Sequence, residues 1–210
     1  MLGKEQEAWL QNALQRSKAR GAIWQVLGQQ VLMGKLNIPV IPPEEVAKLE
    51  LSEFARPRFE QAQQLAPYGL PSNLDAWDGY PAARERLFAM LTAHATNPIS
   101  LAGDTHNGWA FNLTNQKGEA VGVEWGTPGV SSPGLESYVP LPSEQMQALL
   151  KGASPELVAC DTSQRGWTQV TLTPEAATAQ WRFVSSVIEP AYQTSGGEPL
   201  VTQRNARTLA

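Results

Sequence analysis

The sequence has almost no cysteine. Cys160 is the only one among 210 residues, so no disulfide can form within the chain, and no second cysteine gives it the spacing of a zinc site. A lone cysteine most often packs as a small hydrophobic side chain. We therefore expect Cys160 to be buried in the core.

Long hydrophobic runs are also lacking. A membrane-spanning helix requires roughly 18 apolar residues in succession, and the longest apolar runs of this chain are interrupted within a few residues. The opening residues MLGKEQEAWL are polar and follow a helical pattern, without the basic start and apolar stretch of a signal peptide. The sequence therefore predicts no membrane span and contains no recognisable export signal.

Positive charge is scarce as well. The chain has 16 Lys and Arg against 20 Asp and Glu, a net charge of -4, which provides no basic field for a polyanionic nucleic acid. Any recognition of phosphate has to come from a local site, and we expect a small-molecule partner. What the chain does have is 42% hydrophobic residues over 210 positions, enough to bury a substantial core.

Helical and strand-like patterns alternate in the first half of the chain. A helix with basic residues near its end stops at Gly21, and the short apolar run at residues 22–27 has the character of a buried strand. A second helix begins at Pro81, which suits a first helical position, and leads into a strand at residues 99–102. This alternation predicts the α/β class.

The rest of the chain is richer in strand-like segments. These occur at residues 109–113, 121–125, 167–172 and 178–187, with a helix near 143–151. Residues 37–73, rich in proline and charge, are interpreted as a surface excursion with a helix near 59–65. We expect residues 1–190 to form one domain portion and residues 191–210 a flexible tail.

The most informative chemical element follows the strand at residues 99–102. Gly103-Asp104-Thr105-His106-Asn107 gathers polar side chains at the carboxyl end of that strand, the usual ligand site of an open α/β sheet. A carboxylate and an imidazole two residues apart can both face a metal, and the glycine lets the backbone turn. An ordinary turn, with Asp104 as a cap and His106 bonded to the backbone, would have the same letters. The spacing alone leaves both interpretations open.

Several other segments occur in a distinctive order. They are Leu2-Gly3-Lys4-Glu5-Gln6 with Trp9-Leu10, Trp24-Gln25-Val26-Leu27-Gly28-Gln29-Gln30-Val31, Asp75-Ala76-Trp77-Asp78-Gly79-Tyr80-Pro81 with Arg84, the GDTH segment, Val130-Ser131-Ser132-Pro133-Gly134, and Arg165-Gly166-Trp167 leading to Trp181-Arg182-Phe183-Val184. Over roughly residues 2–188 this series resembles the alkaline phosphatase D family of metallophosphoesterases. The DAWDGYP segment followed by GDTHN is its most specific part.

The resemblance implies a four-layer α/β/β/α metallophosphoesterase sandwich, of which this chain would be the C-terminal half. It implies hydrolysis of phosphate monoesters or diesters at a site of ferric iron and calcium, or of other divalent metals. The family's GDxH ligands carry over to Asp104 and His106, which would be both metal ligands and catalytic residues. Their cations would polarise the phosphoryl oxygens and activate an oxygen nucleophile.

Four more residues are candidates for binding the substrate. Trp77 and Asp78, together with Asp75, could shape the mouth of the site, or Trp77 could pack in the core while Asp78 forms the turn before the helix. Arg84 could hold a phosphate by bidentate hydrogen bonds, or lie on the surface as a solvated or ion-paired group. Asn107, directly after His106, completes the set.

The sequence also departs from the family pattern. The family's earlier ligand segments would lie upstream of Met1, and Gln29 and Gln30 stand where related enzymes usually have a histidine after the strand at residues 24–27. We therefore expect an incomplete gene product without activity of its own, with the missing N-terminal half supplied in cis or in trans. The alternatives are a non-catalytic subunit, and a carbohydrate- or protein-binding module in which GDTHN is an ordinary turn. Family members are commonly periplasmic or secreted, and the compartment of this chain stays open.

Overall fold

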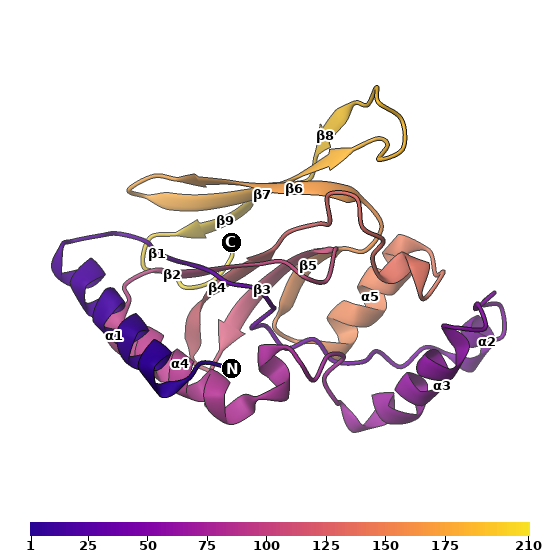
Figure 1. Cartoon of the computed structure of the whole chain (residues 1–210), viewed down its shortest axis with the longest axis horizontal. Helices are drawn as coiled ribbons and strands as arrows, with labels where there is room; N and C mark the ends of the chain where they lie inside the picture. The colour runs from indigo at the N-terminus through magenta and orange to yellow at the C-terminus, as the bar shows by residue number, and fades with distance from the viewer.

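The computed structural model describes residues 1–210 and arranges them in three layers (Figure 1). Helices lie on one side of a five-stranded sheet, and a second, four-stranded sheet covers its other face. The predicted α/β class is confirmed. The family resemblance predicted four layers. The chain contributes three of them, one helical layer and both sheets. It lacks the second helical layer because no helix follows β5.

The helical layer contains two long helices packed against each other, α1 (Lys4–Ala19) and α4 (Pro81–His94). Gly21 follows α1 with a φ of 73°, a left-handed conformation that glycine adopts at little cost, so it ends the helix where the sequence predicted. The shorter helices are α2 (Pro43–Val46), α3 (Arg56–Leu65) and α5 (Ser143–Ala153). No helix combines the length and the hydrophobicity needed to cross a membrane.

The first sheet has the strand order β1-β2-β4-β3-β5. Its strands are β1 (Gln25–Gly28), β2 (Pro98–Ala102), β3 (Gly108–Thr114), β4 (Ala120–Gly126) and β5 (Leu157–Asp161). The strands β1, β2 and β4 are parallel to one another, whereas β3 runs antiparallel between β4 and β5. The loops that follow the three parallel strands therefore meet at one edge of the sheet.

The second sheet is built around β7 (Ala176–Val184), which pairs along its length with β6 (Arg165–Leu172). The two remaining strands, β8 (Thr194–Gly196) and β9 (Leu200–Gln203), pair with opposite ends of β7. The prediction of a flexible tail at residues 191–210 is therefore wrong. Beyond β9 the chain is also held, because the Leu209 amide donates to the Asn112 side chain at 2.8 Å.

Two hydrophobic cores hold the layers together. The larger core lies between the helices and the first sheet and includes Trp109 and Phe111 of β3, both almost fully buried. The smaller core lies between the sheets, where β7 turns alternate residues inward because side chains on a strand alternate between its faces. Cys160 is buried as predicted, and burial raises the pKa of its thiol to about 12.

Residues 37–73 are more than the predicted surface excursion. The segment contains α3 near its predicted place, and its Ile41 and Phe59 side chains are buried in the larger core. The backbone of Asn37 also forms an isolated bridge with Pro71, which closes the segment into a compact loop. This loop forms one wall of a large cavity.

Candidate functional site

The GDTHN loop leaves the carboxyl end of β2, as the sequence predicted, and has an unusual backbone. Asp104 has a φ of 72° and His106 a φ of 61°, so two residues other than glycine adopt the left-handed conformation within one short loop. Such a conformation costs of order 1–3 kcal/mol per residue, and it clusters at functional sites. The hydrogen bond from the Trp109 indole nitrogen to the Thr105 hydroxyl, 2.6 Å long, holds the loop from below.

The imidazole of His106 has a defined orientation. Its Nδ1 lies 2.9 Å from the carbonyl oxygen of Pro133, which can only accept a hydrogen bond, so Nδ1 carries the proton. The other nitrogen, Nε2, is left with its lone pair free. Histidine ligands of metal ions are commonly oriented in this way, because the ring nitrogen that does not bind the metal donates its N–H to a backbone carbonyl.

The loop after β4 supports His106 from the other side. The Gly129 amide donates to the His106 carbonyl oxygen at 3.0 Å. A Cβ at residue 129 would lie only 2.9 Å from the Cβ of His106, so the close approach of the two loops requires glycine there.

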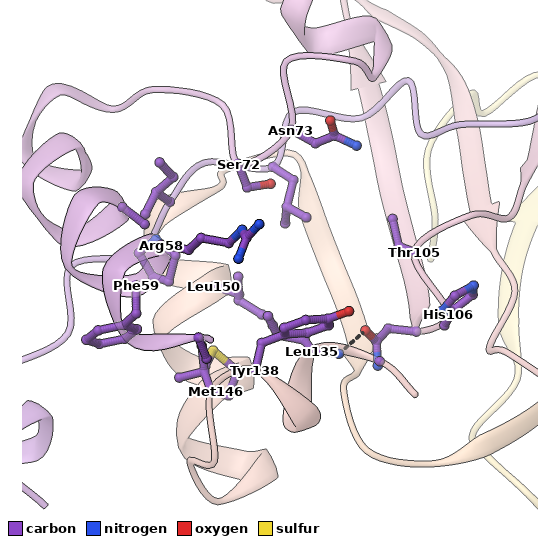
Figure 2. A pocket seen from close by; sticks show the side chains of 18 of the residues that line it. Arg58, Phe59, Ser72, Asn73, Thr105, His106, Leu135, Tyr138, Met146 and Leu150 are labelled. Atoms are coloured by element: carbon purple, nitrogen blue, oxygen red, sulfur yellow. Dashed lines mark hydrogen bonds between the residues drawn. The ribbon is translucent and has the colours of Figure 1, made fainter. Parts of the chain in front are cut away.

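Asp104 presents its carboxylate to solvent beside His106. The residue is exposed, and its carboxylate takes part in none of the salt bridges of the chain. Asp104 and His106 line the same cavity, which has a volume of about 590 Å³. Figure 2 shows Thr105 and His106 on one side of this cavity, with Arg58 and Phe59 of α3 on the other.

Asn107 lies behind the loop and is 1% exposed. Its Oδ1 accepts a hydrogen bond from the Leu135 amide at 2.9 Å, shown dashed in Figure 2. Its Nδ2 is buried without a partner, although the residue lines the cavity. An unpaired buried donor costs about 1–3 kcal/mol. Because this atom is inaccessible, Asn107 holds the turn at Leu135 and does not reach a ligand in this conformation.

Sequence reasoning missed a second support of the loop, Arg165. Its guanidinium forms an ion pair with Glu136 and reaches the carbonyl oxygen of His106 at 3.4 Å. Glu136 in turn accepts from the amide of Gly134 at 3.1 Å. The segment beginning at Arg165 was part of the family resemblance, but no local pattern connects residues 106, 136 and 165, so only the tertiary structure shows this role.

The structure gives Arg84 a different role from the predicted one of binding phosphate or lying on the surface. It is neither on the surface nor free to bind a phosphate, because it is 1% exposed and its three nitrogens already have partners. The Nε atom donates to the Met33 carbonyl at 2.6 Å, and the two terminal nitrogens donate to the Thr114 carbonyl and to Glu156. Arg84 therefore fixes the segment after β1 to the end of β3, away from the cavity.

Trp77 and Asp78 do not share the surroundings of His106. Trp77 is buried, donates from Nε1 to the Gln29 side chain at 2.8 Å and does not line the main cavity, which matches the packing alternative. Asp78 is half-buried and lines a small neighbouring cavity of about 30 Å³ together with Asp104. Its Oδ2 has no partner, and burial raises the pKa of the Asp78 carboxyl, with the Arg84 charge opposing the shift.

Gln29 belongs to a buried network beneath the site. Its amide nitrogen donates to the Ser100 hydroxyl at 3.0 Å and to Glu124 at 3.2 Å. Glu124 also accepts from the amides of Met33 and Gly34. Burial raises the pKa of the Glu124 carboxyl, while these hydrogen bonds oppose the shift. The network ties together the ends of β1, β2 and β4, which gives Gln29 a structural role.

The donors of this loop fit a metal ion, but there are only two of them. A free carboxylate and an imidazole nitrogen suit iron, zinc and manganese, and the carboxylate also suits calcium. No group of three or more His, Cys, Asp or Glu side chains in the chain is placed to share a metal. A tight site therefore needs donors from elsewhere.

The chain is similar to known proteins both in sequence and in structure. The model of the PhoD-like phosphatase family matches residues 1–181. The chain is 29% identical over 214 residues to alkaline phosphatase D of Bacillus subtilis (strain 168), covering 100% of this chain and 31% of that protein. A solved structure described as the structure of PhoD superposes with a TM-score of 0.68 at 26% identity, covering 100% of this chain and 34% of that one. The chain thus spans about a third of the length of these relatives, less than the half predicted from the sequence.

Proposed function

The chain belongs to the PhoD-like phosphatase family, and on that premise we propose that it supplies Asp104 and His106 to a metal-dependent site that hydrolyses phosphate monoesters or diesters. One observation carries the proposal. Asp104, whose carboxylate is exposed, and His106, whose Nε2 has no hydrogen-bond partner, are both among the residues that line one cavity, on a loop whose backbone is held in a costly left-handed conformation.

Each residue of the loop has a distinct part in the proposed site. Asp104 offers carboxylate oxygens, and His106 offers Nε2 because the Pro133 carbonyl keeps the proton on Nδ1. Asn107 is the third proposed contact, to a phosphoryl oxygen, for which its buried Nδ2 would first have to become accessible. Ferric iron and calcium are the proposed cations, with other divalent metals as alternatives, and when bound they would polarise the phosphoryl oxygens and activate an oxygen nucleophile.

We further propose that the remaining ligands come from sequence outside this chain, in cis or in trans. Two donors cannot hold a binuclear centre at ordinary affinity, and the relatives are about three times longer than the matched part. The alternative is a non-catalytic subunit of the same fold. The presence of only two metal donors favours this alternative as well.

A complementation experiment tests the proposal. The chain alone, supplied with ferric iron and calcium, is expected to show no turnover of p-nitrophenyl phosphate or of bis-p-nitrophenyl phosphate. Co-expression with the portion of Bacillus subtilis alkaline phosphatase D that the chain does not match should restore hydrolysis. Asp104→Asn and His106→Gln should abolish the restored activity, whereas Glu198→Gln, at an exposed carboxylate outside the cavity lining, should keep it.

The outcomes separate the possibilities. Robust turnover by the isolated chain would contradict the need for outside ligands. A complex that forms without activity would favour the non-catalytic subunit. Metal binding is read independently by titrating Mn²⁺ into the isotope-labelled chain, where the NMR signals of Asp104 and His106 should broaden first. Broadening elsewhere, with these two residues unaffected, would remove the chemical basis of the proposal.

A further inference from the structure

The cavity beside Asp104 and His106 is much larger than a phosphate group requires. Its volume of about 590 Å³ lies within the range of small-molecule sites, about 300–1,000 Å³. It extends from the GDTHN loop to α3 on one side and to α5 on the other (Figure 2). A phosphate held at Asp104 and His106 would therefore leave most of this space to whatever the phosphate is attached to.

The walls away from the GDTHN loop are mainly apolar. The segment at residues 36–41 and α3 form one wall, and α5 with the turn before it forms the other. The apolar side chains of these walls include Ile38, Ile41, Phe59, Val139, Met146 and Leu150. Trp109 adds an aromatic surface below the loop, with its indole nitrogen already bonded to Thr105. Such a lining favours an apolar group over a sugar or a polar headgroup.

One positive charge stands at this cavity without a carboxylate partner. Arg58 of α3 lines the cavity and takes part in none of the salt bridges of the chain. Its guanidinium lies 4.1 Å from the centre of the Phe54 ring and donates to the Phe54 carbonyl at 3.2 Å, which holds it on the helix. Figure 2 shows its side chain extending from α3 toward the cavity. A cation here attracts an anionic ligand into an otherwise apolar site.

We infer that this cavity binds the organic group of the phosphate ester, and that the site takes esters of bulky aromatic or branched aliphatic alcohols. The inference rests on the proposed function and adds the substrate class. The phosphate lies at the GDTHN loop, the apolar group lies between α3 and α5, and Arg58 draws the anion in. No reaction step beyond ester hydrolysis is involved.

A comparison of two non-hydrolysable ligands tests the substrate class. 2-Naphthylphosphonate and methylphosphonate have the same anionic group and differ in apolar area. Burying a group of this size should make the naphthyl compound bind at least about tenfold more tightly, as measured by NMR titration of the chain with Ca²⁺ present to offset the charge of the Asp104 carboxylate. The Trp109 indole signal and the methyl signals of Met146 and Leu150 should shift with the naphthyl ligand alone. Equal affinities would overturn the inference.

Variants of the wall make the test specific. Ala62→Asp introduces a carboxylate at a residue of α3 that lines the cavity, and it should weaken naphthylphosphonate at least about tenfold with little effect on methylphosphonate. Val139→Asn, on the opposite wall, serves if the first variant unfolds. Arg58→Ala should weaken both ligands, whereas Arg56→Ala, an exposed arginine of the same helix outside the lining, should weaken neither. Loss of both ligands in Arg56→Ala would contradict a role specific to Arg58.

Failure of this inference is distinguishable from failure of the proposed function. Asp104→Asn should abolish the complemented hydrolysis and keep the preference for the naphthyl ligand, because the two depend on different walls. If the wild-type complex hydrolyses esters but aryl and methyl esters react equally well, the inference fails while the proposed function stands. If the polypeptide that completes the domain blocks naphthylphosphonate, the cavity is an interface between polypeptides and the inference is overturned.

Discussion

The Nδ1 atom of His106 lies 2.9 Å from the carbonyl oxygen of Pro133. His106 belongs to the loop after β2, and Pro133 lies in the loop after β4, the parallel neighbour of β2. The pairing of these two strands therefore brings together a ring nitrogen and a backbone oxygen that are 27 residues apart in the chain. The contact decides which imidazole nitrogen carries the proton and which is left free.

This contact predicts the tautomer of His106. Its Nδ1 should carry the proton in the neutral ring, so ¹⁵N NMR at alkaline pH should show a protonated Nδ1 and an unprotonated Nε2. The second histidine, His94, lies in the last turn of α4 and has no such carbonyl partner, so it should show the mixture typical of a solvated ring. Identical patterns for the two histidines would contradict this orientation of His106.

Gly129 should not tolerate a side chain. In Gly129→Ala the new Cβ would press on His106 at 2.9 Å, so we expect a loss of about 1–3 kcal/mol in the free energy of unfolding, and altered NMR signals of the imidazole. Urea denaturation measures the loss. Gly152 of α5 is the matched control, because a Cβ added there would meet nothing within 4 Å and alanine should stabilise the helix by about 0.5–1 kcal/mol.

The buried pair of Arg84 and Glu156 should be sensitive to loss of one partner. Their side chains are 2% and 6% exposed, and they lie 2.7 Å apart. Arg84→Met leaves a buried carboxylate without its cation and should cost about 3–5 kcal/mol in the free energy of unfolding. The double variant with Glu156→Gln should recover part of that loss.

A surface arginine of the same helix provides the control for Arg84. Arg86 pairs with Glu7 at 3.0 Å, but its side chain is 57% exposed. Arg86→Met should therefore cost no more than about 1 kcal/mol. Similar losses for the two arginine variants would mean that burial adds nothing to the role of Arg84.

Asp78 should make stability depend on pH. Burial raises the pKa of its carboxyl above the ordinary value of 3.8. The folded state therefore binds this proton more tightly than the unfolded state, so the contribution to stability is fully present below pH 3.8 and is lost as the pH rises through the folded pKa. Asparagine cannot ionise and does not suffer this loss.

The measurement is urea denaturation of the wild type and of Asp78→Asn across a series of pH values. The free energy of unfolding of the variant should rise relative to the wild type as the pH increases from the acid side. A difference that stays constant, or one that shrinks with rising pH, would show that the Asp78 carboxyl is better solvated or better paired than its unpaired Oδ2 indicates.

Local patterns were sufficient to predict some elements. The stop at Gly21, the start of α4 at Pro81 and the GDTHN loop after β2 each depend on a few adjacent residues, and each is found where the sequence predicted. The short strands β8 and β9 escaped prediction because they have few apolar residues, and their pairing with β7 supplies order that composition does not indicate.

The candidate site, too, could be predicted from local patterns only in part. The presence of Asp104 and His106 at a strand end followed from the sequence and from the family resemblance. Arg84 was misread because its partners Met33, Thr114 and Glu156 lie 30 to 72 residues away along the chain, so no local pattern could show that its charge would be buried and compensated. Arg165 was overlooked for the same reason.

Composition and short motifs, by themselves, determined the α/β class, the buried cysteine and the loop that bears a carboxylate and an imidazole. Only the tertiary structure decided which nitrogen of His106 is free, which arginine is used for packing, and that a large apolar cavity opens beside the loop. The physical reason is the range of the interactions. Helix ends and turns depend on neighbours within a few residues, whereas an ion pair, a carbonyl contact or a cavity wall requires segments that only the packing of the sheets and helices brings together.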